Sequence, residues 1–366
     1  MVLDDETQVL ESKTTKDNNL LESVIGFDAL YSSMYKCRKG VMWKGSVASF
    51  FLNGIEKTLN LEKKLKDGTY KALPPVKFKV TSPKEREILS ITYRDRVYQR
   101  SLNDNYIYPT MTKGFIRDNC ACQKGKGTDD ARSRFKCFLQ RAYRKYGTEF
   151  SLLQCDIHGY YPNMRHNVAK KTFRKKMNKV ICDRANKVLD EQYAGDVGFN
   201  PGSQMIQIAG ISVLDPIDHF IKETLRVKLY IRYMDDFILI HNDPEFLEDC
   251  KNKIRKELSD MGFTFNEKKT KVFSIKKGIL FLGFKYTITN SGKILMQLNP
   301  ENVKRERKKL YRLVALVQSG DLTKAKVDDC YSAWRNHASN GNSYHLLEKM
   351  DSYYNSLWKG VVPNGY

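Results

Sequence analysis

The stretch Leu229–His241, LYIRYMDDFILIH, places two adjacent aspartates, Asp235 and Asp236, between two apolar runs of β-prone residues. The runs LYIRY and FILI predict two strands joined by a tight acidic turn. Burial and mutual repulsion oppose the ionisation of neighbouring carboxylates, so a buried acidic pair indicates a divalent cation. Asp is also common in solvent-exposed hairpin turns, and this stretch alone leaves both interpretations open.

A third aspartate strengthens the metal interpretation. Asp156 ends the run SLLQCD, which predicts a buried strand, and the sequence IHGYY follows it. A strand-end Asp and the hairpin pair can converge on two Mg²⁺ ions, because carboxylate oxygens are preferred ligands of that ion. Two such ions would activate a 3′-hydroxyl and stabilise the charge on a transferred phosphorus. The three carboxylates therefore predict nucleotidyl-transfer chemistry.

The composition points to a polyanionic partner. The 366 residues carry a formal net charge of +21, from 63 Lys and Arg against 42 Asp and Glu. Neutralising phosphates releases counterions, so this excess favours nucleic acid, although an anionic lipid surface or simple solubility would also suit it. No apolar run approaches the roughly 20 residues that span a membrane, and the N-terminus is too acidic for a targeting peptide. The eight cysteines form no C-x-x-C pair, as is typical of reduced thiols. We therefore expect a cytoplasmic nucleic-acid-binding protein with no membrane contact.

Hydrophobic spacing predicts mixed helices and strands, and hence an α+β fold. Residues 1–25 are expected to form a flexible lead-in, and VKFKV and ILSITY to form a basic hairpin around a turn at Ser82–Arg86. The other predicted elements are helices over 26–66, over 95–147 with a break at Gln123–Thr128, over 167–194, over 206–225 with an end or kink at Pro216, over Glu245–Met261 and from about 298, and short strands in TFN, KVFSI and GILFLGFKYTI.

Several motifs follow one another in order around the aspartates. They are REILSITYRDRVYQ at Arg86–Gln99, DIHGYY at Asp156–Tyr161, GFNPGSQMIQ at Gly198–Gln207, YMDD at Tyr233–Asp236, FNEKKTKV at Phe265–Val272 and FLGF at Phe281–Phe284. Over roughly residues 26–366 the chain resembles the reverse transcriptases. It is most similar to bacterial enzymes of the group II intron-like lineage, closest to those of diversity-generating retroelements and to the "unknown group" enzymes associated with defence.

This resemblance implies a right-hand polymerase fold, with fingers, a palm built on an antiparallel sheet, and a helical thumb. The division that it implies is 26–150 for N-terminal helices and fingers, 151–297 for the palm, and 298–366 for the thumb. Part of the fingers would lie between the first two palm motifs.

The resemblance also implies roles for single residues. Asp156, Asp235 and Asp236 would be catalytic and, with Ile157, would hold two Mg²⁺ ions, while Lys269 would protonate the departing pyrophosphate, with Lys268 in reserve. Tyr161 would stack under the deoxyribose and reject a 2′-hydroxyl. The other implied roles are nucleotide contacts by Lys79, Lys84, Arg86 and Gln207, and template or primer contacts by Lys124, Lys126, Arg132, Phe281, Gly283, Lys304, Arg305 and Lys308. A solvated basic helix face, a core aromatic or a buried strand would account for many of these residues without any ligand.

These motifs predict an RNA-directed DNA polymerase that copies an associated structured non-coding RNA into cDNA from dNTPs, in bacterial anti-phage defence. The alternative is a diversity-generating enzyme, whose G-x-x-x-S-Q pattern fits Gly202 and Gln207 but not Ile206. A non-catalytic RNA-binding scaffold with a palm fold and an RNA-dependent RNA polymerase are further alternatives. The three carboxylates argue against the first of these, and the aromatic residue at position 161 argues against the second.

Overall fold

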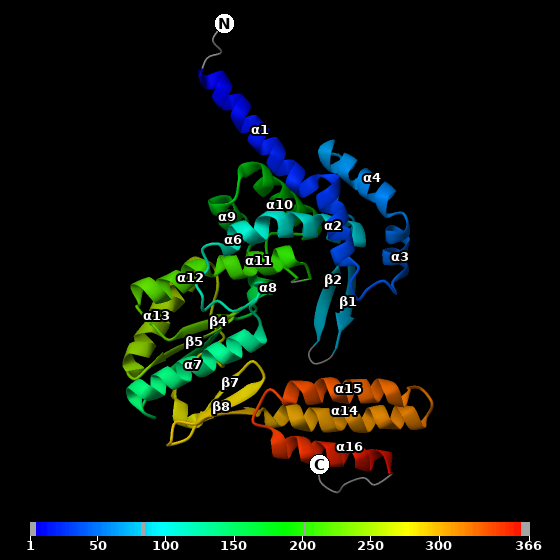
Figure 1. The fold of residues 1–366 in the computed structure, drawn as a ribbon. Coiled ribbons are helices and arrows are strands. Elements are labelled where there is room, and N and C mark those ends of the chain that lie inside the picture. The colour runs from blue at the N-terminus through cyan, green and yellow to red at the C-terminus, as the bar shows by residue number, and fades with distance from the viewer. Residues whose placement is uncertain (1–4, 82–84, 201, 360–366) are drawn as a thin grey trace. The chain divides into compact units, whose positions relative to one another are not determined.

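A computed structural model describes residues 5–81, 85–200 and 202–359 of the chain (Figure 1). The chain divides into two compact units. The first unit contains Met1–Gly127, Gln154–Ile238 and Cys250–Thr270, and the second contains Thr128–Leu153, Leu239–Asp249 and Lys271–Tyr366. This division does not follow the fingers, palm and thumb boundaries expected from the sequence, because strands β3 and β5 each run from one unit into the other.

The first unit begins with four helices and a hairpin. Their bounds are α1 (Asp5–Ile25), α2 (Phe27–Cys37), α3 (Gly45–Leu52), α4 (Gly54–Lys66), β1 (Val76–Val80) and β2 (Arg86–Ser90). A lead-in was expected over 1–25, and residues 5–25 of it form helix α1, whose last residues, Val24 and Ile25, are buried. The strands β1 and β2 are antiparallel, as predicted, with Val80 opposite Arg86. The second strand ends earlier than ILSITY suggested, because the Thr92 side chain accepts a hydrogen bond from the Asp95 N–H and begins the next helix.

Helices form most of the rest of this unit. They are α5 (Tyr93–Leu102), the π-helix η1 (Asn103–Ile107), α6 (Tyr108–Thr112), α8 (Tyr160–Asn163), α9 (His166–Lys176), α10 (Lys179–Gln192), α11 (Gln204–Val213), α12 (Asp215–His219) and the π-helix η2 (Phe220–Thr224). The single helix expected over 167–194 is two helices, because Asn178 caps a new one by accepting from the Val180 N–H. Pro216 lies in the first turn of α12, and α11 ends before it, as predicted.

A four-stranded sheet carries the three aspartates. Its strands are β3 (Ser151–Asp156), β4 (Tyr230–Tyr233), β5 (Asp236–His241) and β6 (Lys271–Ser274), in the order β4-β5-β3-β6. Asp156 ends β3 and Asp236 begins β5, and these strands are neighbours in the sheet. The predicted hairpin around YMDD and the predicted strand SLLQCD are therefore confirmed. The TFN segment is not a strand, since only Phe265 forms an isolated bridge, to Ile157. Helix α13 (Pro244–Asp260) follows the hairpin and agrees with the helix predicted there.

The second unit combines a long helix, a small sheet and three C-terminal helices. Helix α7 (Thr128–Tyr146) belongs to this unit, although the sequence placed it with the fingers. Strands β7 (Ile279–Phe281), β8 (Phe284–Ile288) and β9 (Ile294–Leu298) form an antiparallel sheet. The predicted C-terminal helical region consists of α14 (Pro300–Gln318), α15 (Lys324–Ala338) and α16 (Tyr344–Trp358), which share a core of Leu310, Val314, Val327, Tyr331, Met350, Tyr354 and Leu357 (Figure 1).

Candidate active site

The turn that joins β4 and β5 is held by a fully buried ion pair. Met234 has a φ of +59°, which is strained for a residue with a side chain. Arg232 lies just before the turn and is completely buried, and its Nη1 donates to the Met234 carbonyl at 2.9 Å. The same guanidinium binds both carboxylate oxygens of the buried Asp218, at 2.7 and 2.5 Å. Such a bidentate pair fixes orientation as well as charge, so Arg232 fixes the conformation of the turn that carries Asp235 and Asp236.

The three aspartates meet with one lysine. The Lys269 Nζ lies 2.8 Å from Asp156 Oδ1, and the Asp156 carboxyl is also within hydrogen-bonding reach of the Asp236 carboxyl. The Thr270 hydroxyl accepts a hydrogen bond from the Asp156 N–H at 3.2 Å and so fixes the backbone at this position. Residues separated by more than a hundred positions along the chain therefore form one acidic cluster.

Burial and mutual repulsion oppose the ionisation of Asp235 and Asp236. Burial raises the pKa of Asp235, and the negative charge of Asp156 raises it further. The pKa of Asp236 rises from 3.8 to about 7, chiefly through burial and then through the charges of Asp235 and Asp156. Lys269 partly offsets this repulsion, and its own pKa is raised by the hydrogen bond to Asp156. The site therefore has a deficit of positive charge.

The donors present fit a hard divalent cation, because three carboxylates in a partly desolvated site favour Mg²⁺ and disfavour one another. Within the residues that the structure describes, however, no group of three or more His, Cys, Asp or Glu side chains has the spacing of a preformed metal site. The Lys269 ammonium, in contact with Asp156, contributes positive charge to the cluster. Ile157 is buried beside these groups and pairs with Phe265 through the backbone.

Tyr161 lies on helix α8, directly after Tyr160, close to the acidic cluster. Burial raises the pKa of its hydroxyl far above the usual range, with further contributions from Cys122 and Asp235. Its Oη is buried and has no hydrogen-bond partner among the described residues. Gln207 also lies near the turn that joins β4 and β5. Cys122 connects the two, because its Sγ lies 3.9 Å from Gln207 Oε1 and 3.4 Å from Met234 Sδ.

The predicted fingers contacts are only partly described. Lys84 lies outside the described residues, and Arg86 is placed in β2 by its backbone alone. Lys79 is exposed and pairs with Glu85 at 3.2 Å.

Two of the predicted template contacts have structural partners instead. Arg132 is buried, pairs with Asp129 at 2.8 Å, donates to the Leu282 carbonyl at 3.2 Å and stacks over Phe284. Lys126 donates to the backbone carbonyls of residues 116, 117 and 119. Arg132 therefore holds the turn between β7 and β8, and Lys126 holds the backbone around residue 117, uses that a count of basic residues cannot reveal. Their template role stays a prediction. Lys124 is exposed and remains accessible to a strand.

The predicted primer contact at FLGF is a tight turn between β7 and β8. Leu282 and Gly283 both have positive φ values, +46° and +88°, and Phe281 and Phe284 are buried on either side. Phe281 packs against Phe135 of α7, so its ring belongs to the core of the second unit. The backbone of the turn, and not the Phe281 ring, is the part that can meet a ligand.

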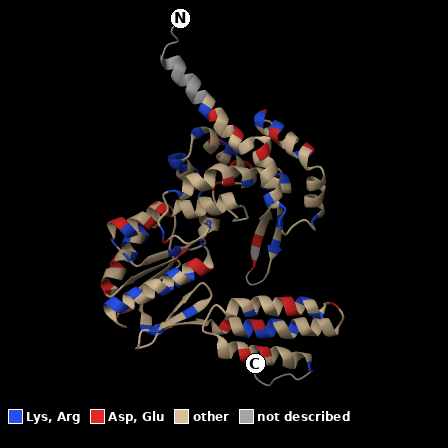
Figure 2. Ribbon diagram, viewed as in Figure 1, with Lys and Arg blue, Asp and Glu red and all other residues tan. Residues whose placement is uncertain are grey.

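The basic residues predicted in the thumb lie on α14, a helix with many Lys and Arg positions (Figure 2). Lys304, Arg305 and Lys308 are all exposed. Lys304 pairs with Glu301 at 3.4 Å and Arg305 donates to Asn302, whereas Lys308 has neither kind of contact within the described residues.

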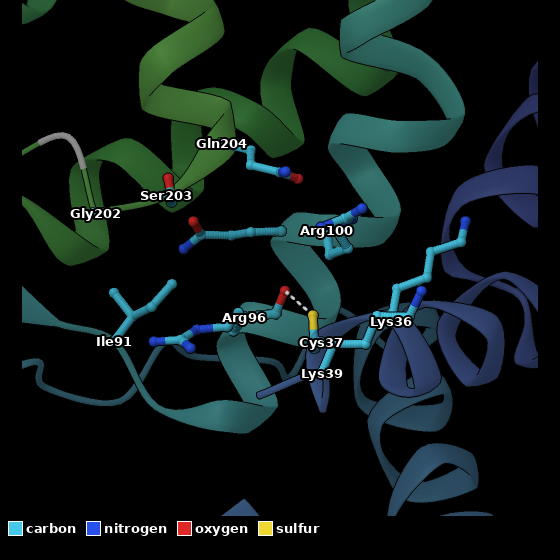
Figure 3. Close-up of a pocket in the computed structure, with 10 residues that line it drawn as sticks. Lys36, Cys37, Lys39, Ile91, Arg96, Arg100, Gly202, Ser203 and Gln204 are labelled. Carbon is cyan, nitrogen blue, oxygen red and sulfur yellow. Dashed lines mark hydrogen bonds between the residues drawn. The ribbon is translucent and has the colours of Figure 1, made fainter. Parts of the chain in front are cut away.

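A basic cavity in the first unit was missed by the sequence analysis. It has a volume of about 490 Å³ and is lined by α2, α5 and the start of α11 (Figure 3). Four cations surround it: Lys36, Lys39, Arg96 and Arg100. Arg100 and Lys36 share Asp104, at 2.7 and 3.5 Å. Within the described part of the chain, Arg96 and Lys39 have no ion-pair partner. The spacing of Lys36 and Lys39, at and just beyond the end of α2, and of Arg96 and Arg100 on α5 was visible in the sequence, but the meeting of these segments was not.

Comparison with known proteins identifies the family. The profile described as "Reverse transcriptase (RNA-dependent DNA polymerase)" matches residues 81–286, which is more than half of the chain. The chain belongs to the reverse transcriptase family. Asp156, Tyr161, Asp235, Asp236 and Lys269 lie within the matched span. A search of curated proteins finds no match.

Solved telomerases share the reverse transcriptase fold at low sequence identity. Telomerase from Candida albicans in complex with a fragment of telomeric RNA is 13% identical, over 80% of this chain and 56% of that one, with a TM-score of 0.50. Apo telomerase from Candida tropicalis, truncated from its C-terminal domain, is 14% identical over 67% and 60% of the two chains, with a TM-score of 0.47. The chain thus spans a little over half of the length of these telomerases, and at such identity the similarity concerns the fold alone. The α+β reverse transcriptase fold predicted from the sequence is confirmed.

Over the residues described, no helix combines the length and the apolar character needed to cross a bilayer.

Proposed function

We propose that this reverse transcriptase family member is an active RNA-directed DNA polymerase that extends a primer on an RNA template with dNTPs. The observation that carries the proposal is the meeting of Asp156, Asp235, Asp236 and Lys269 in one partly buried cluster. A cluster of like charges is costly to maintain, and its presence inside the family's matched region favours catalysis over a scaffold role.

Each residue of the cluster has a distinct task. Asp156, Asp235, Asp236 and Ile157 would hold two Mg²⁺ ions, which when bound supply positive charge to the oxygens of the transferred phosphoryl group. Arg232 holds the Met234 carbonyl, so the two aspartates of the turn keep their orientation when their charges change. Lys269 donates a proton to Asp156 in a hydrogen bond and is poised to donate one to the departing pyrophosphate.

Tyr161 would select the sugar. Its hydroxyl is buried and the residue lies close to Asp235, so its ring would offer an aromatic surface that clashes with a 2′-hydroxyl. Gln207 would contact the same nucleotide, and Lys79, Lys84 and Arg86 would contact its phosphates.

A primed RNA template offered either dNTPs or NTPs tests this proposal. We expect dNTP incorporation by the wild type and none by Asp156→Ala or Asp236→Ala, with RNA binding retained, because binding rests on basic surfaces. The matched control is Asp183→Asn, an exposed carboxylate on α10, which should leave incorporation unchanged. Robust NTP incorporation would instead indicate an RNA-dependent RNA polymerase.

The basic cavity would bind phosphates of the RNA strand. Arg96 and Lys39 are its two cations without an ion-pair partner in the described residues, so replacing both by Gln removes two phosphate contacts. For single-stranded RNA the slope of log K against log salt should then weaken by about 1.4. Lys63→Gln with Lys64→Gln removes the same charge from the exposed face of α4 and should leave the slope unchanged. Equal slopes for the two double variants would rule the cavity out as a strand site.

The biological role is proposed from the sequence resemblance. We infer that the template is a structured non-coding RNA, that cDNA is the product, and that the enzyme acts in the bacterial cytoplasm in anti-phage defence. Sequencing the nucleic acid that co-purifies with the protein tests this inference. A single repeated cDNA that matches one non-coding RNA would support it, whereas cDNA with many substitutions would favour the diversity-generating alternative. A protective effect that persists in Asp235→Asn would favour the scaffold alternative.

A further inference from the structure

Gly210 lies in the interior of helix α11 and is buried. Glycine is a poor helix former, because it loses more backbone freedom than any other residue on folding. A glycine at a buried helical position therefore indicates that something approaches the backbone closely. At Gly210 that neighbour is Tyr161.

A side chain at position 210 would collide with the Tyr161 ring. A Cβ added to Gly210 would lie 2.6 Å from Tyr161 Oη, 2.9 Å from Cζ and 3.0 Å from Cε1. Carbon and oxygen atoms in contact normally stay more than about 3.3 Å apart, so a methyl group requires a displacement of several tenths of an ångström.

The backbone at Gly210 is not the part that can yield. The Tyr160 hydroxyl donates to the Gly210 carbonyl at 2.5 Å, and Tyr160 is itself buried, with its ring packed against Phe263. Every residue from Ile208 to Val213 is buried, so this part of α11 is enclosed.

The Tyr161 ring is the part that can move. Its hydroxyl makes no hydrogen bond within the described residues, so no bond is lost when it shifts. The residue is partly exposed, whereas Gly210 is not, and a displaced ring therefore moves towards its exposed side. Under the proposed function, that side is where the nucleotide sugar rests.

We propose that Gly210 is a specificity-determining position, because the absence of its side chain sets the depth of the Tyr161 ring and thereby the space for the incoming nucleotide. This inference rests on the proposed function. It adds a residue that contacts no reacting group and acts through Tyr161 alone, as a positioning residue.

Kinetics of single-nucleotide incorporation test the proposal. Gly210→Ala should raise the KM for dNTPs about tenfold while kcat stays within about threefold, since the site for chemistry is intact and only the nucleotide space shrinks. Tyr161→Phe removes the closest of the three contacts, so the Gly210→Ala defect should become several-fold smaller in the Tyr161→Phe background. Ser212→Ala, at another buried position of α11 whose hydroxyl has no partner among the described residues, serves as the control for helix packing.

Two results would overturn the inference: a KM for Gly210→Ala within twofold of the wild type, or effects of the two substitutions that multiply independently. A double-mutant cycle of urea unfolding compares the wild type, Gly210→Ala, Tyr161→Phe and the double variant. It measures the coupling between positions 161 and 210 and does not depend on enzymatic activity. If the wild type incorporates no dNTP, the proposed function fails. In that case the unfolding cycle alone tests whether Gly210 sets the position of the Tyr161 ring, and the absence of coupling between the two positions would refute the inference.

Discussion

Asp236 is expected to destabilise the folded protein above neutral pH when divalent cations are removed. Its pKa is about 7 in the folded chain against 3.8 in an ordinary peptide, through burial and the charges of Asp235 and Asp156. At about 1.36 kcal/mol for each pH unit, this difference amounts to about 4 kcal/mol. Between the two pKa values the folded state binds more protons than the unfolded state. Protonated Asp236 therefore stabilises the folded state relative to ionised Asp236. This stabilisation is fully present below pH 3.8 and is lost as the pH rises through 7.

The perturbation that isolates this contribution is Asp236→Asn, which removes the charge and keeps the shape. Urea unfolding in the presence of a chelator, at about pH 5 and about pH 8, gives the free energy of unfolding for each protein. Of the 4 kcal/mol, about 3 kcal/mol is lost between these pH values in the wild type, because about 1.36 kcal/mol is lost per pH unit between 5 and 7. The variant should therefore gain about 3 kcal/mol relative to the wild type on going from pH 5 to pH 8.

Titrating groups outside the acidic cluster are shared by both proteins and cancel in the difference, whereas Asp235, Asp156 and Lys269 interact with Asp236 and contribute to the measured change. Asp183→Asn should show no such pH-dependent gain, because that carboxylate is exposed. Mg²⁺ should restore the wild type at pH 8 and the Asp236→Asn protein much less, since a bound ion stabilises by mass action. A difference between wild type and Asp236→Asn that stays constant within about 0.5 kcal/mol from pH 5 to pH 8 would refute the assigned burial and repulsion.

Two further predictions concern the residues that position the site. Asp218→Asn leaves the buried Arg232 guanidinium without its counter-charge and should lower the free energy of unfolding by about 3–5 kcal/mol, measured in urea; a loss below about 1 kcal/mol would contradict the buried pair. Lys269→Met should slow single-turnover incorporation by about 100-fold if this lysine protonates pyrophosphate, whereas Lys268→Met should not; equal losses in both variants would assign the effect to general charge.

Much of the local structure followed from the sequence because it depends on neighbours in the chain. Alternating and continuous apolar runs were sufficient to predict the strands on both sides of YMDD and the strand ending at Asp156. Pro216 ended its helix because a proline ring cannot be accommodated in a helix interior. The helix breaks at Thr92 and Asn178 were not predicted, because they depend on single side-chain caps that polar residues also form in other settings.

The roles of the basic residues could not be predicted in the same way. Arg132 and Lys126 occur in a basic segment that looks like a strand-binding surface, and both are occupied by carbonyls and carboxylates of their own unit. Conversely, Arg96 belongs to the Arg86–Gln99 motif and Lys39 to no predicted site, and both line a cavity that the sequence did not predict. The partner of a long cationic side chain depends on which backbone groups come within its reach, and this is a tertiary property.

Apolar patterning and turn preference act over a few residues, so they were sufficient to predict a tight acidic turn between two strands at Asp235 and Asp236. They could not predict that Asp156 and Lys269 join this pair, that the Arg232–Asp218 ion pair holds the turn, or that the Tyr161 ring packs against Gly210. Desolvation, repulsion and steric contact act through space, between residues that the chain brings together only when it is folded.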